Sequence, residues 1–211
     1  MLFCIFAILL TLQQTINIML NKDYWQNRYH ENKIGWDAGN ITTPIKEYFD
    51  QIEDKNLKIL IPGCGNAHEA AYLFEQGFTN LYLCDWAQAP LNAFAEEHPK
   101  FPKEQLICAN FFELEENSFD YVIEQTFFCA IDPTLRPNYA KKMAEILKEG
   151  GQLVGLMFEL EESGKEGPPF RGNKAEYLTY FEPYFSAIKM EPCTNSIKPR
   201  VGAELFVEFK K

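Results

Sequence analysis

Short apolar runs alternate with amphipathic segments along most of the 211-residue chain. Five of the runs are nearly continuous in apolar residues, as expected of strands buried on both faces of a parallel sheet. These runs lie at 57–62, 81–84, 105–110, 119–125 and 151–160. Helical spacing follows at 66–77, from about 87, and at 134–151. The alternation predicts an α/β fold with a doubly wound, mostly parallel sheet.

The two ends of the chain add to this pattern. Near the N-terminus, Trp25 and Tyr29 are four residues apart and share one face of a predicted helix, and Trp36 follows in a loop. The C-terminal part predicts a helix at 174–184 and two late strands near 187–190 and 205–209. We expect these two strands to form an antiparallel edge, which brings the sheet to seven strands.

The first eighteen residues contain about ten apolar residues in a row, whereas a helix needs roughly twenty to span a bilayer. They also lack the basic stretch and small-residue cleavage site of a signal peptide, which makes secretion the weaker alternative. We interpret residues 1–18 as an extension that precedes an alternative start at Met19, and residues 19–211 as a single domain. We expect no stable membrane insertion and a cytoplasmic location.

The net charge, together with the positions of the cysteines and histidines, limits the kinds of ligand and partner that we expect. Thirty acidic and twenty basic residues give a formal charge of −10, which repels phosphate backbones and anionic membrane surfaces. The six cysteines and three histidines are scattered and form no C-x-x-C pair, so we expect reduced thiols and no metal site. The sequence predicts a small-molecule substrate, no nucleic acid partner and a monomeric protein.

A glycine turn follows the first predicted strand. Gly63 and Gly65 lie where an open α/β sheet binds ligands, and Asp85 ends the second strand, where a carboxylate can accept both hydroxyl hydrogens of a ribose. Nicotinamide enzymes share these features, but the third glycine of their G-x-G-x-x-G pattern would fall at His68. A nucleoside cofactor is predicted; a nicotinamide oxidoreductase and an ordinary glycine-rich connection are the alternatives.

Several long segments, in order, resemble the thiopurine methyltransferase superfamily, and its halide and thiol methyltransferases in particular. The segments are the aromatic triplet with W-D-x-G, IPGCGNAHE, NFFEL, FFCAIDPTLRP and GPPF. The resemblance implies a Rossmann-like class I methyltransferase with S-adenosyl-L-methionine as its cofactor. It also implies methyl transfer to a small soft nucleophile, which is a thiol, hydrosulfide, thiocyanate or halide. A non-catalytic protein that binds S-adenosylmethionine is the alternative.

The resemblance implies a cofactor pocket and assigns its residues. These are Trp25, Tyr29, Trp36, Gly63, Gly65, Asp85, Asn110, Phe111 and Gln125. In this assignment the aromatic triplet lies over the sulfonium and carboxylate end of the cofactor. Asp85 binds the ribose, and Asn110 and Phe111 flank the adenine. Phe127, Phe128, Phe158 and Phe170 would keep water out of the site or, on spacing alone, pack in the core.

Three residues are candidates for catalysis. Gln125 stands where the halide enzymes commonly have a tyrosine near the methyl donor. Arg136 resembles an arginine at the acceptor mouth and could hold an anion, or it is a solvated surface arginine. Tyr139, one turn later, could donate a hydrogen bond, or it is a half-buried packing residue. Tyr29, Asn110 and Gln125 depart from the family pattern, which leaves the identity of the acceptor open.

Overall fold

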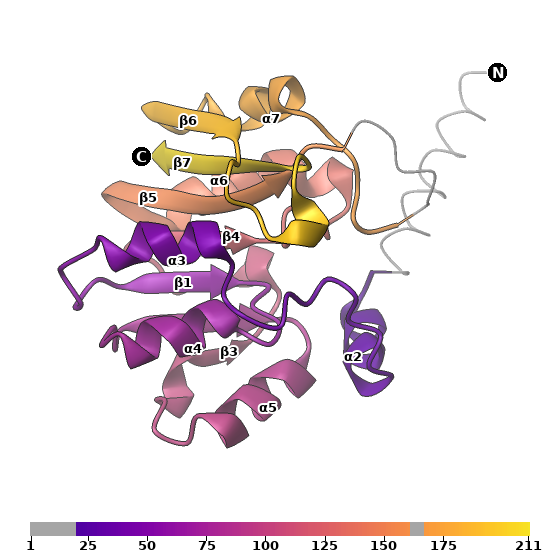
Figure 1. Cartoon of the computed structure of the whole chain (residues 1–211), viewed down its shortest axis with the longest axis vertical. Coiled ribbons are helices and arrows are strands. Elements are labelled where there is room, and N and C mark those ends of the chain that lie inside the picture. The colour runs from indigo at the N-terminus through magenta and orange to yellow at the C-terminus, as the bar shows by residue number, and fades with distance from the viewer. Residues whose placement is uncertain (1–19, 161–166) are drawn as a thin grey trace.

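The computed structural model describes residues 20–160 and 167–211, so the predicted extension at 1–18 lies outside the described residues. Seven strands form one sheet in the order β3-β2-β1-β4-β5-β7-β6 (Figure 1). The order places the first strand in the middle and winds the chain outward on both sides of it. The predicted doubly wound α/β fold is confirmed.

Five of the strands are parallel. They are β1 (Ile59–Pro62), β2 (Leu81–Asp85), β3 (Leu106–Cys108), β4 (Phe119–Gln125) and β5 (Leu147–Phe158). All four residues of β1 are buried, which explains the continuous apolar run, because helices cover both of its faces. β7 (Glu204–Lys210) pairs antiparallel with β5 and with β6 (Ala187–Pro192). The predicted antiparallel edge is therefore present.

Helices pack on both faces of the sheet, and each face has its own apolar core (Figure 1). One core joins the sheet to α3 (Thr43–Asp50), α4 (His68–Glu75) and α5 (Gln88–Glu97). The other joins it to α6 (Arg136–Ile146) and α7 (Lys174–Phe181). α2 (Lys22–His30), the remaining α-helix of the described residues, buries none of its residues fully and lies beyond the carboxyl end of β1 in Figure 1.

Two elements differ from the sequence-based prediction. The helix predicted at 134–151 ends at Ile146, and β5 begins at Leu147. Gly150 lies within β5, where its pairing with β4 shifts register, and has a φ of +74°, a value that glycine adopts without strain. α3 was not predicted by the apolar pattern, because its buried face consists of Ile45 and Phe49 with Pro44 at its start.

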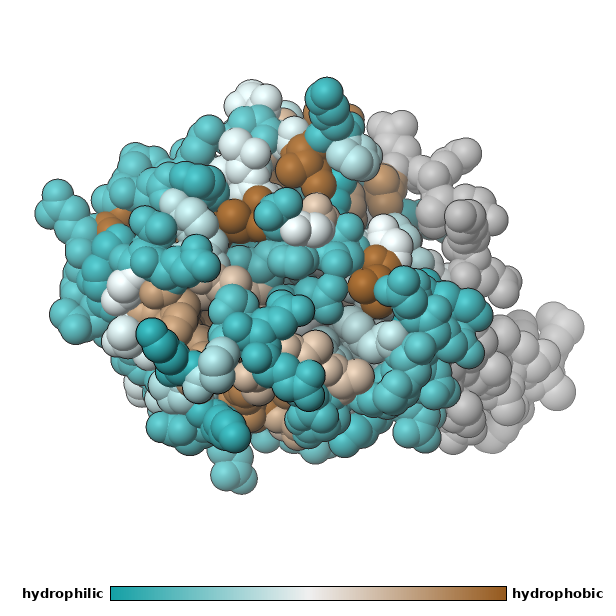
Figure 2. All heavy atoms as spheres, turned by 60° about the horizontal axis from the view of Figure 1, so that its bottom comes forward, coloured by the Kyte–Doolittle hydropathy of each residue, from teal (hydrophilic) through white to brown (hydrophobic). Residues whose placement is uncertain are grey.

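The described surface is mostly polar. Figure 2 shows hydrophilic residues over most of the face it presents, with hydrophobic residues in small separate patches. Within residues 20–160 and 167–211, no helix is both long and apolar enough to cross a membrane. The same residues contain no group of three potential metal ligands, and their five cysteines are free thiols.

Candidate functional site

A cavity of about 1040 Å³ lies at the carboxyl ends of the parallel strands. Residues that end or directly follow β1 to β5 contribute to its lining, namely Gly63, Asp85, Ala109, Thr126 and Phe158. Trp25, Tyr29 and Trp36 line it from α2 and the loop that follows. Ligands bind at this position in open α/β sheets because the strand order reverses here and leaves a crevice.

The glycine turn after β1 brings backbone and aromatic rings into close contact. Gly63 has a φ of +57° and Gly65 a φ of +53°. A Cβ atom on Gly63 would lie 2.4 Å from a ring carbon of Phe127, and one on Gly65 would lie 3.1 Å from the Tyr29 hydroxyl. Both the backbone conformation and the space therefore require glycine at Gly63. The Phe127 ring therefore packs directly on the Gly63 backbone at the wall of the cavity.

Asp85 is the last residue of β2 and is only 7% exposed. Its Oδ2 accepts a hydrogen bond from Gly65 N at 3.0 Å, and its Oδ1 accepts one from Ala87 N at 2.8 Å. Burial raises the pKa of this carboxyl to about 6, although these backbone N–H groups oppose the rise. Each oxygen accepts one backbone bond and has a second lone pair. Asp85 can therefore also accept hydroxyl hydrogens from a ligand in the cavity.

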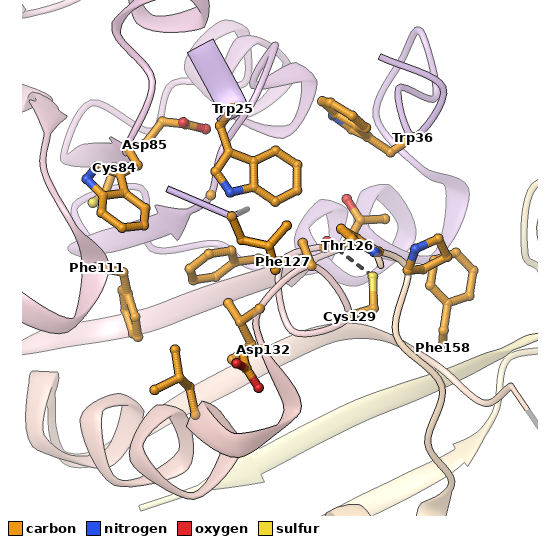
Figure 3. A pocket seen from close by; sticks show the side chains of 18 of the residues that line it. Trp25, Trp36, Cys84, Asp85, Phe111, Thr126, Phe127, Cys129, Asp132 and Phe158 are labelled. Atoms are coloured by element: carbon orange, nitrogen blue, oxygen red, sulfur yellow. Dashed lines mark hydrogen bonds between the residues drawn. The ribbon is translucent and has the colours of Figure 1, made fainter. Parts of the chain in front are cut away.

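The aromatic wall comes from α2 and the loop that follows it. Asn21 caps the N-terminus of α2, because its side chain accepts a hydrogen bond from Tyr24 N at 2.9 Å. The rings of Trp25 and Tyr29 each meet the Trp36 ring edge to face, with centroids 5.7 Å apart. Figure 3 shows the Trp25 ring opposite Phe127. The three predicted aromatic residues thus form one continuous surface.

The loop that carries Trp36 is held by two residues that the sequence analysis did not select. Asp37 accepts hydrogen bonds from Gly39 N at 2.9 Å, Asn66 Nδ2 at 2.6 Å and His68 Nε2 at 2.7 Å. Burial alone would raise the pKa of Asp37, but these hydrogen bonds lower it overall. Arg200, far away in the sequence, donates from Nη2 to the Trp36 carbonyl at 2.6 Å. In the sequence, the W-D-x-G motif was the one local indication that Asp37 holds this loop, and no local pattern indicated Arg200.

The opposite end of the cavity is formed after β3. Asn110 and Phe111 both line it. The Asn110 side chain accepts from Phe112 N at 3.2 Å and thereby starts the short helix η2 (Phe111–Glu113). Figure 3 shows Phe111 and Asp85 toward one end of the cavity, and Trp36 and Phe158 toward the other. The two ends of the cavity therefore differ chemically, because the Asp85 carboxylate lies at the end that holds Phe111.

Two of the three candidate catalytic residues are buried and do not line the cavity. Arg136 is 1% exposed. Its Nη1 lies 3.1 Å from Glu176 Oε1, and its Nη2 donates to the Phe170 carbonyl at 3.3 Å. The alternative of a solvated surface arginine is therefore wrong. Tyr139 is fully buried rather than half-buried, and its hydroxyl donates to the Glu124 carboxylate.

Gln125 and Gly65 border a second, smaller cavity of about 40 Å³ behind the glycine turn. The Gln125 Oε1 accepts from the Thr42 hydroxyl at 3.5 Å, and its Nε2 has no hydrogen-bond partner within the described residues. Of the four phenylalanines considered above, Phe127 and Phe158 line the main cavity. Phe128 instead packs in the core, which is the alternative that its spacing left open, and Phe170 does not line the main cavity.

The family model for thiopurine S-methyltransferase matches residues 20–205, which is most of the chain. The chain belongs to the thiopurine S-methyltransferase family. Thiocyanate methyltransferase 1 of Arabidopsis thaliana is 31% identical over 195 residues, which cover 89% of this chain and 84% of that protein. Thiopurine S-methyltransferase of Vibrio cholerae is 23% identical over 179 residues, which cover 77% of this chain and 82% of that protein.

Solved structures of other methyltransferases share the fold of this chain. A 1,6-didemethyltoxoflavin-N1-methyltransferase from Burkholderia thailandensis, solved with S-adenosylhomocysteine, has a TM-score of 0.69 at 16% identity and covers 90% of this chain and 86% of its own. A TehB-like methyltransferase from Corynebacterium glutamicum has a TM-score of 0.63 at 16% identity, with coverage of 90% and 98%. This member of the thiopurine S-methyltransferase family is an S-adenosylmethionine-dependent methyltransferase. The nicotinamide alternative is thereby excluded.

The residues of this family member fit the cofactor. Gly63 lines the cavity, and without a Cβ atom its backbone lets the Phe127 ring pack directly against it there. Asp85 supplies the buried acceptor that a ribose diol needs, and its own hydrogen bonds hold it in place. The faces of Trp25 and Trp36 would attract a positively charged sulfonium group.

Proposed function

We propose that the protein transfers the methyl group of S-adenosylmethionine to a small soft nucleophile, which is a thiol, hydrosulfide, thiocyanate or halide. One observation carries the proposal. Relatives named as thiocyanate or thiol methyltransferases are 28–31% identical to this chain and are covered over 84% of their length. When bound, the cofactor supplies a methyl group that its positive sulfur already activates. The protein then has to bind the two substrates, align the acceptor with the methyl group and exclude water.

The chemistry of the cavity supports an acceptor that needs no strong base. None of the three histidines lines it within the described residues. Burial raises the pKa values of the lining thiols Cys84 and Cys129 to about 12, so both stay protonated at neutral pH. Halides and thiocyanate arrive as anions, and small thiols ionise readily. Such acceptors react once they are aligned with the methyl group.

We assign the cofactor along the length of the cavity. Asp85 binds the ribose, Asn110 and Phe111 flank the adenine, and Gly63 lets the backbone approach the ligand. Gly65, which does not line this cavity, acts through the hydrogen bond from its N–H to Asp85. The sulfonium then lies toward the tryptophans, where aromatic faces favour a cation. Phe127 and Phe158 exclude water from the acceptor.

Gln125, Arg136 and Tyr139 act in this proposal as positioning residues. Tyr139 donates to Glu124, whose Oε1 accepts from Phe127 N at 2.8 Å and from Phe128 N at 2.9 Å. This carboxylate therefore fixes the turn that carries Phe127 into the cavity. We also retain the predictions of a cytoplasmic, monomeric protein without a nucleic acid partner. The net charge of −10 supports the last of these, because it repels phosphate backbones.

The test is a turnover assay with S-adenosylmethionine against thiocyanate, hydrosulfide, iodide, a small aromatic thiol and a thiopurine. We expect release of S-adenosylhomocysteine with at least one of the small sulfur or halide acceptors. Asp85→Asn serves as the control, because it should remove cofactor binding with little change in shape. No turnover with any of these acceptors, despite S-adenosylhomocysteine binding in calorimetry, would contradict the proposed acceptor class.

A further inference from the structure

The cavity contains one guanidinium group whose charge is not matched. Four cationic side chains line it within the described residues, namely Arg28, Lys141, Lys142 and Arg200. Three of them have partners. Lys141 pairs with Glu145, Lys142 donates to the Leu114 carbonyl, and Arg200 pairs with Glu204 and donates to the Trp36 carbonyl. Arg28 forms no ion pair with any described residue.

Arg28 is also short of hydrogen bonds. Its Nε is buried and has no hydrogen-bond partner in the part of the chain that the structure describes. Glu31, three residues further along, is paired with Lys33 at 2.8 Å instead. A buried donor without an acceptor destabilises the folded protein, and the cost is larger when the group is charged. Such a group is retained at a binding site when a ligand supplies the missing acceptor.

The position of Arg28 identifies which part of a ligand it meets. Its Cζ atom lies 5.4 Å from the centroid of the Trp36 ring. Figure 3 shows Trp36 at the end of the cavity away from Asp85 and Phe111. A nucleoside with its ribose on Asp85 and its base beside Phe111 must extend its 5′ substituent toward this other end.

We infer that Arg28 binds the carboxylate of the amino-acid part of S-adenosylmethionine, an inference that rests on the cofactor placement of the proposed function. The carboxylate is the anionic group of this ligand at neutral pH, and a guanidinium binds a carboxylate through paired, charge-assisted hydrogen bonds. Trp36 contributes a flat surface on which the guanidinium lies. The cation therefore orients the cofactor and holds the methyl group in a fixed direction.

Calorimetry with two ligands tests this inference. The ligands are S-adenosylhomocysteine and its decarboxylated analogue, which keeps the nucleoside, the thioether and the amine. We expect Arg28→Met to weaken S-adenosylhomocysteine binding by about tenfold to a hundredfold and to leave binding of the analogue within about twofold. Lys33→Met removes an exposed positive charge just after the same helix and should leave both affinities unchanged.

Three outcomes would overturn the inference. Unchanged S-adenosylhomocysteine affinity in Arg28→Met would mean that the guanidinium does not contact the carboxylate. An equal loss for both ligands would mean that Arg28 supports the aromatic wall instead. If the wild-type protein binds neither ligand, the cofactor placement itself fails, and this failure is distinguishable because it does not depend on any substitution.

Discussion

Gly63 meets two separate physical demands, and a second glycine in the chain meets only one of them. A φ of +57° at Gly63 costs roughly 1–2 kcal/mol for a residue with a side chain. Its Cβ would in addition collide with the Phe127 ring at 2.4 Å. Gly39 has a φ of +72°, and nothing lies within 4 Å of its Cβ position. A comparison of substitutions at Gly63 and Gly39 therefore separates the cost of backbone strain from the cost of a steric collision.

We expect Gly63→Ala to weaken S-adenosylhomocysteine binding at least tenfold, because Phe127, which lines the cavity, has to move. Gly39→Ala should lose about 1 kcal/mol of stability from its backbone alone and keep its affinity. Urea denaturation gives the free energies of unfolding, and calorimetry gives the affinities. Similar affinity in both variants would show that the space above Gly63 is not part of the cofactor site.

Arg136 connects three elements of the fold. It begins α6, pairs with Glu176 on α7 and donates to the Phe170 carbonyl in the segment before that helix. Its guanidinium also lies over the rings of Phe128 and Tyr177, at 5.0 and 5.4 Å. A planar group with several donors suits this enclosed position better than lysine would. We therefore expect Arg136 to act through the packing of these elements and not by contact with the acceptor.

We expect Arg136→Met to lower the free energy of unfolding by about 3 kcal/mol, because it leaves polar partners without their donor. Turnover with thiocyanate and with a neutral thiol should fall by the same factor, since the guanidinium does not line the cavity. Arg171→Met, at an exposed position, is the control for the substitution. A loss confined to the anionic acceptor would instead place Arg136 at the acceptor mouth.

The sequence predicted elements better than it predicted the surroundings of single residues. The parallel strands were evident because burial on both faces makes them continuously apolar, and Asp85 was found because it ends such a strand. The partners of Arg136 lie 34 and 40 residues further along the chain, so no local pattern could distinguish a buried arginine from an exposed one. Arg200 and Trp36 are likewise 164 residues apart.

Two buried carboxyl groups make the stability of the whole molecule depend on pH. Asp85 and Glu124 are 7% and 0% exposed, and neither forms an ion pair within the described residues. Burial raises the pKa of Asp85 to about 6 and that of Glu124 to about 7, although hydrogen bonds to both oppose the rise. In the unfolded chain the same groups ionise near pH 4. The native state therefore holds their protons to higher pH.

Because the native state binds more protons than the unfolded chain between about pH 4 and 7, the free energy of unfolding falls as the pH rises through this range. The net charge of −10 at pH 7 acts in the same direction through self-repulsion. We expect stability in urea to be lower at pH 8 than at pH 5 by on the order of 3 kcal/mol. Glu124→Gln should flatten this dependence, since an amide does not ionise, whereas Glu96→Gln, at an exposed position, should keep the wild-type slope. Stability that rises from pH 5 to pH 8, or equal slopes in the two variants, would mean that these carboxyls are ionised at lower pH than their burial implies.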